Sequence, residues 1–134
     1  MANKTVTNVD MGSVLIGSGY FYDEVIAVSE DRELPAGLIL ARSTAGATDG
    51  KLVPYVDGGA DGSGTPGFVL TYDVDATNGD NAVRVLISGP VDQNRLIVDG
   101  EDTGDAITGA LRDQLRRHDI IVQDSDQLSS YDNQ

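Results

Sequence analysis

One stretch, from Gly67 to Gly89, constrains the fold more than any other part of the chain. It reads GFVLTYDVDATNGDNAVRVLISG, and two runs of alternating apolar residues flank an Asn-Gly step. Alternate residues of a strand share one face, and Asn-Gly between two such runs is a strong hairpin signal. The pattern therefore predicts a central β-hairpin with a wide loop, ending where Pro90 breaks the chain. The residues predicted to share its apolar face are Phe68, Leu70, Tyr72, Val74, Val83, Val85 and Ile87.

The rest of the chain offers short apolar runs separated by turns rich in glycine and proline. Such runs predict strands at 20–28, 38–41, 51–56 and 120–122, and the proline inside 51–56 suggests an edge strand. A single helix is predicted from about Asp105 to Arg117. Its residues Ile107, Leu111 and Leu115 recur every four positions on one face. The sequence thus predicts a small, mainly β domain with one C-terminal helix.

Charge is the most informative feature of the composition. The 134 residues carry 9 basic and 22 acidic side chains, for a net charge of −13. A protein this acidic is repelled by phosphate backbones, so direct binding of nucleic acid is not expected. No apolar run approaches the roughly 20 residues that a membrane helix needs. Two interpretations of the acidity stay open: an ordinary solvated surface, or adaptation of a halophilic protein to molar salt, where charges are screened within about 3 Å.

The two ends of the chain differ from its middle. Residues 1–19 are polar and punctuated by glycine, with one apolar patch at Val14, Leu15 and Ile16. Both an arm that orders against a partner and a plain edge strand of the same domain fit this pattern. Residues 123–134 form a polar, acidic tail. We therefore divide the chain into an arm (1–19), a domain (20–122) and a tail (123–134).

Four features of the sequence bear on chemistry. The match to G-x-G-x-x-G at 62–67 leads into a strand instead of a helix, so it is interpreted as a linker. His118, the only histidine, follows two arginines at a helix end, where a structural role suffices. No paired carboxylates suggest catalysis, and we expect neither an enzyme nor a cofactor. The Asp-rich turn leaves an alternative function open, a cation- or carbohydrate-binding β module with a cation site at Asp73, Asp75 and Asp80.

Several segments together resemble one known family. They are FYDEVIAVSEDREL, LPAGLILAR, GKLVPYV, GFVLTYDVDATNGDNAVRVLISGPV and ALRDQLRRHDIIV, in this order between Tyr20 and Val122. The chain resembles the head decoration proteins of tailed viruses, the lambda D-like capsid stabilisers. This resemblance implies a compact barrel-like or β-tulip-like fold with an extended N-terminal arm.

The resemblance also implies a function. The expected protein is a structural component of the virion, assembled in the host cytoplasm, which binds the outside of the mature capsid as a homotrimer. It would act as a cement by bridging neighbouring capsomers, with the major capsid protein as its partner. The arm would contact the capsid by adding a strand to it. The residues expected to make this contact are Val14, Leu15, Ile16, Tyr20, Phe21 and Tyr22.

Overall fold

The computed structural model describes residues 14–27, 33–75, 80–100 and 107–124. The chain is mainly β with one α-helix, as the sequence predicts. The elements are β1 (Tyr20–Ile26), β2 (Glu33–Leu34), β3 (Ile39–Arg42), η2 (Gly46–Thr48), β4 (Leu52–Pro54), β5 (Pro66–Val69), β6 (Val74–Asp75), β7 (Asn81–Asp92), η3 (Gln93–Arg95), α1 (Gly109–Arg116) and β8 (Ile120–Gln123).

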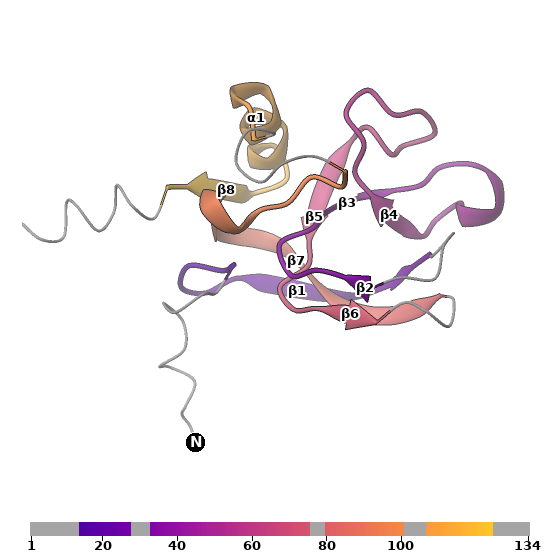
Figure 1. Cartoon of the computed structure of the whole chain (residues 1–134), viewed down its shortest axis with the longest axis horizontal. Helices are drawn as coiled ribbons and strands as arrows, with labels where there is room; N and C mark the ends of the chain where they lie inside the picture. Colours follow the sequence, from indigo (N-terminus) through magenta and orange to yellow (C-terminus); the bar gives the residue numbers. More distant parts are fainter. Residues whose placement is uncertain (1–13, 28–32, 76–79, 101–106, 125–134) are drawn as a thin grey trace, which may run out of the picture.

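Five of these strands close into a barrel in the order β1-β4-β3-β5-β7, because β7 also pairs with β1. The β1–β7 pairing is antiparallel along all of β1, whereas β1 and β4 run parallel and align only at Ile26 and Leu52. Strand β4 thus has neighbours on both sides, and its prediction as an edge strand is wrong. Strand β8 extends the sheet beyond β7, in parallel, and α1 lies over β8 and β5 (Figure 1).

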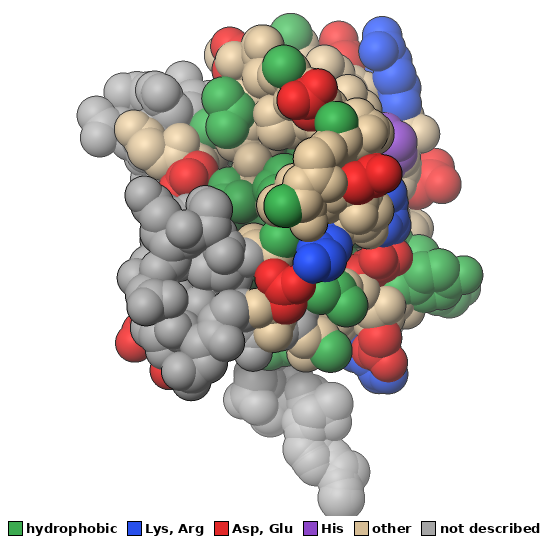
Figure 2. Space-filling view, turned by 90° about the vertical axis from the view of Figure 1, so that its right-hand side faces the viewer, with side chains coloured by type: hydrophobic (Ala, Val, Ile, Leu, Met, Phe, Trp, Pro, Cys, Tyr) green, Lys and Arg blue, Asp and Glu red, His purple; other side chains and the backbone are tan. Residues whose placement is uncertain are grey.

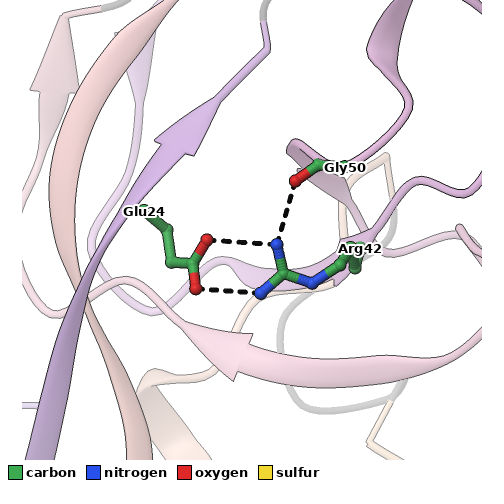
Figure 3. A network of polar contacts seen from close by, with 3 residues as sticks. All are labelled: Glu24, Arg42 and Gly50. Carbon is green, nitrogen blue, oxygen red and sulfur yellow. Dashed lines mark hydrogen bonds and ion pairs between the residues drawn. The ribbon is translucent and has the colours of Figure 1, made fainter.

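Side chains reinforce the short seam between β1 and β4 (Figure 3). The two terminal nitrogens of Arg42 donate to Oε1 and Oε2 of Glu24 at 3.1 and 2.8 Å, and Nη1 also donates to the carbonyl of Gly50. The guanidinium lies 5.1 Å from the ring centroid of Phe68. The hydrogen bond that Arg42 donates to Glu24 raises the pKa of Arg42. This bidentate pair links β3 to β1 across β4, where backbone pairing is sparse.

The apolar core has two layers. The inner layer draws buried residues from β1, β3, β4 and β7 and fills the barrel, and the partly buried Phe68 of β5 packs against it. Its buried members are Ile26, Leu34, Leu38, Leu40, Leu52, Leu70, Val74, Val83 and Val85. The helix-side layer lies between the barrel wall, α1, β8 and the chain around residue 14. Its buried members are Val14, Ile39, Ala41, Tyr55, Val69, Leu86, Val91, Leu96, Val98, Ile107, Leu111, Leu115 and Ile120.

Strand β3 contributes to both layers, which explains its unbroken apolar run. Leu38 and Leu40 belong to the inner layer, and Ile39 and Ala41 to the helix-side layer. All four are fully buried. Successive side chains of a strand point to opposite faces, so a strand covered on both faces is apolar at every position.

Helix α1 confirms the predicted helix and part of its apolar stripe, since Leu111 and Leu115 are buried in the helix-side layer. The helix begins at Gly109 because Thr108 caps it: its Oγ1 accepts a hydrogen bond from the N–H of Leu111. The predicted start near Asp105 is therefore too early. Ile107 is buried in the same layer but precedes the cap, and residues 101–106 lie outside the described residues.

The predicted hairpin is wrong in its first strand. β5 ends at Val69, and Val69 and Leu70 are both fully buried, on opposite sides of the barrel wall. Tyr72 is 45% exposed, so it does not share a buried face with Leu70. Val74 pairs with Leu34 in a separate two-stranded sheet, β2-β6. The Asn-Gly step lies outside the described residues.

Pro90 does not break the chain, contrary to the prediction. Strand β7 continues through it to Asp92, and Pro90 aligns with Ile121 of β8. Its carbonyl accepts a hydrogen bond from the N–H of Ile16, and the nearby backbone N–H groups that donate belong to Gly89 and Asp92. Proline lacks only the backbone N–H, and at this position the strand pairing uses its carbonyl instead.

Candidate functional site

Residues 14–16 lie antiparallel along the end of β7. The N–H of Asp92 donates to the carbonyl of Val14, and the N–H of Ile16 donates to the carbonyl of Pro90, both at 2.9 Å. Leu15 forms a bridge with Val91 between these two bonds. The side chain of Val14 is only 3% exposed and belongs to the helix-side layer. The root of the predicted arm is therefore attached to the domain.

A close backbone crossing leads from this segment into β1. A Cβ atom on Gly19 would lie 2.6 Å from Cδ1 of Leu86 and 2.8 Å from the carbonyl oxygen of Ser88. Gly89, opposite, has a φ of +138° that side chains disfavour. Glycine at both positions lets the two backbones approach, which fixes where β1 begins on the barrel.

Strand β1 presents aromatic residues to the surface. Tyr20 is 74% exposed and Tyr22 is 63% exposed, whereas Phe21 packs against the helix-side layer. Within the described residues, β1 aligns with β4 only at Ile26, so no strand covers the other edge of residues 20–25. The surface formed by Tyr20, Tyr22 and this edge is called the β1 face below. An open strand edge with large exposed side chains suits pairing with an extended segment of another protein.

The predicted cation site does not assemble. The Oδ1 atom of Asp73 accepts a hydrogen bond from the N–H of Ala36, and Asp80 forms an ion pair with Lys51. Asp75 lies in β6, opposite Glu33. In the part of the chain that the structure describes, no cluster of three or more histidine or acidic residues could hold a metal ion. Asp73 thus binds backbone and Asp80 binds lysine, as aspartates in turns commonly do.

Three further expectations from the sequence concern His118, the membrane and the acidic surface. His118 is exposed just beyond α1, where its N–H donates to the carbonyl of Leu115. Across the described ranges, no helix is both long and apolar enough to cross a membrane. On the face drawn in Figure 2, acidic side chains occupy several separate places among uncharged ones.

The Glu24–Arg42 pair could not be predicted from the sequence, because its partners are 18 residues apart and share no local pattern.

The fold and its surface define a small closed β-barrel protein with an aromatic strand open to contact. The model of one family, bacteriophage lambda head decoration protein D, matches residues 7–120. The chain belongs to this family, and the predicted resemblance is confirmed. The family has a structural role in decorating the phage capsid, which implies a non-enzymatic protein. No curated protein matches the chain.

Proposed function

We propose that this protein binds the outer surface of the mature phage capsid as a homotrimer and stabilises the capsid by bridging neighbouring capsomers. The observation that carries the proposal is the family match over residues 7–120. Its partner is the major capsid protein. Many copies on a symmetric lattice gain avidity, so no single contact has to be strong.

The β1 face is the best candidate for the capsid contact. Tyrosine supplies a large contact area with few rotatable bonds, and Tyr20 and Tyr22 are the two most exposed large apolar side chains among the described residues. The open edge of β1 supplies backbone donors and acceptors for an added strand. Phe21 supports this surface from below, because it packs on the helix-side layer.

The arm has two parts in this proposal. Val14, Leu15 and Ile16 hold its root on β7, next to the β1 face, through the bonds to Asp92 and Pro90. Residues 1–13 lie outside the described residues, and we assign them the direct contact with the capsid. Val14 itself would reach the capsid only by leaving the helix-side layer, where it is 3% exposed.

Co-sedimentation with undecorated, expanded capsids tests the proposal. Wild-type protein should bind saturably, and the double variant Tyr20→Ser/Tyr22→Ser should bind at least tenfold more weakly. The control is Val56→Ser, which removes another exposed apolar side chain, 49% accessible, at the end of a different strand. Absence of wild-type binding would disprove the function. Equal losses in the control and the double variant would disprove the role of the β1 face.

The acidic surface is proposed to reflect a high-salt environment. Glu33 and Asp75 are exposed and directly opposite each other in the β2-β6 pair, where like charges repel. Together with the net charge of −13, this repulsion should weaken the fold at low ionic strength. The melting temperature should therefore fall on dialysis from molar to millimolar salt. A melting temperature that does not change with salt would contradict the halophilic interpretation.

A further inference from the structure

A groove runs between α1 and β8, on the opposite side of β8 from β7. It has a volume of about 240 Å³ and is lined by Arg112, Asp113, Arg116, Ile121 and Val122. Ile121 and Val122 are consecutive, so their side chains point to opposite faces of the strand. A groove lined by both therefore follows the strand's edge.

That edge of β8 lacks a strand partner among the described residues. β8 is the last strand of the six-stranded sheet and pairs only with β7. Ile121 is 38% exposed beside it. An edge with unpaired backbone groups and an exposed apolar residue accepts an extended segment readily.

The groove is also basic, in a protein with a net charge of −13. Arg116 forms an ion pair with Asp113. Arg112 donates to the neutral Oε1 of Gln93 at 2.9 Å, and within the described ranges no carboxylate pairs with it. Arg117 follows directly and adds a third cation at the end of α1. An incoming segment with carboxylates would be attracted to this place and repelled by most of the remaining surface.

The chain itself contains a segment of this chemistry. Residues 123–134 read QDSDQLSSYDNQ, with three aspartates and no basic residue. Gln123 belongs to β8, so the segment that can leave the domain is 125–134. In an extended strand its residues Asp126, Leu128 and Asp132 would share one face. Two carboxylates, one on either side of a leucine, match a groove of arginines and an exposed isoleucine. Ten extended residues span roughly 33 Å, enough to reach a neighbouring copy.

Asp124 is held by its own copy. Its Oδ1 accepts from Nδ2 of Asn94 at 3.3 Å. Asn94 lies in η3, directly after β7, and Gln123 pairs with Asp92 as the last residue of β8. Residues 125–134 are therefore the part of the tail that we assign to a neighbouring copy.

We propose that residues 125–134 of one copy bind in the α1–β8 groove of the next copy, adding a strand to β8 and pairing their aspartates with Arg112 and Arg116. This inference rests on the proposed homotrimer. Passing the tail from each copy to the next gives a head-to-tail contact that closes a ring.

Sedimentation equilibrium of the full-length protein tests the exchange. The double variant Arg112→Gln/Arg116→Gln should associate at least tenfold more weakly than wild type. The matched control, Lys51→Gln/Arg84→Gln, removes the same charge from positions outside the groove lining and should keep the wild-type mass. A monomeric wild type, or equal masses for the two double variants, would overturn the inference. Capsid co-sedimentation is measured separately, so failure here is distinct from failure of the proposed function.

A synthetic peptide of residues 123–134 gives a second test that needs no variant to fold. Added to wild-type protein, it should compete with the tails and lower the average mass, whereas a scrambled peptide should not. A peptide that does not bind, or that binds without changing the mass, would overturn the exchange between copies.

Discussion

The two apolar layers of this small barrel are built in different ways. The inner layer is made by strands that surround it on every side, and its members come from the part of the chain between Ile26 and Val85. The helix-side layer combines the barrel wall with segments from both ends of the described chain, Val14 at one end and Ile120 at the other. The comparison indicates that the inner layer maintains the fold, whereas the helix-side layer also connects the arm and the tail to it.

The largest effect should come from the inner layer. Leu40→Ala removes a fully buried side chain from inside the closed barrel, where the surrounding strands have little room to collapse. We expect a loss of about 4 kcal/mol in the free energy of unfolding. Denaturant unfolding measures it. A loss below about 1 kcal/mol would show that the barrel interior is loosely packed.

Val14→Ala should have a smaller and more local effect. It removes two methyl groups from the rim of the helix-side layer, at a cost of about 2 kcal/mol. Hydrogen exchange should speed up first at the amides of Ile16 and Asp92, which join the arm to β7. If the hydrogen-exchange rate instead rises uniformly over the barrel amides, the inner layer and the helix-side layer are not distinct in stability.

Arg42→Met tests the seam that closes the inner layer. The substitution keeps an apolar stem over Phe68 but removes the bidentate bond to Glu24. The two side chains are 41% and 18% exposed, so the expected loss is only about 1 kcal/mol. Thermal melting of the single variants Arg42→Met and Glu24→Gln and of their combination measures the coupling between the two residues. Additive losses would show that the pair contributes nothing of its own.

Tyr55→Phe should change how stability depends on pH in the alkaline range. Burial, reinforced by the nearby charge of Asp57, raises the pKa of Tyr55 above its ordinary value of 10.0. The folded protein then holds the phenolic proton more tightly than the unfolded chain. This contribution to stability is complete below pH 10 and is lost as the pH rises through the folded-state pKa. Wild-type stability should fall more steeply above pH 10 than that of the variant, and equal slopes would refute this expectation.

Local patterns were sufficient for several parts of the fold. The spacing of Ile107, Leu111 and Leu115 predicted α1, and the aromatic run after Gly19 predicted β1. The apolar run at 120–122 predicted β8. Each of these elements shows its burial within a window of a few residues, so a single sequence reveals it. Tyr20 and Tyr22 stay predicted contact residues, and their exposure could not be foreseen from the sequence.

Non-local pairing accounts for what the sequence did not reveal. The alternating pattern of residues 68–74 predicted a strand with one buried face, but β5 is buried on both of its faces. Val74 pairs instead with Leu34, forty residues earlier in the chain. The burial of Val14 depends on β7, which is far away in the sequence. Gly37 is another case: a Cβ there would lie 1.9 Å from the carbonyl oxygen of Arg95, a contact that no local pattern announces.

The central claim is that this protein stabilises the capsid by binding through the β1 face. The most direct test is the temperature at which genome-filled capsids release their DNA, followed with a dye that fluoresces on exposed DNA. Capsids saturated with wild-type protein should release DNA at a higher temperature than bare capsids, and capsids incubated with Tyr20→Ser/Tyr22→Ser should behave like bare ones. An identical release temperature for bare and wild-type-saturated capsids would contradict the claim.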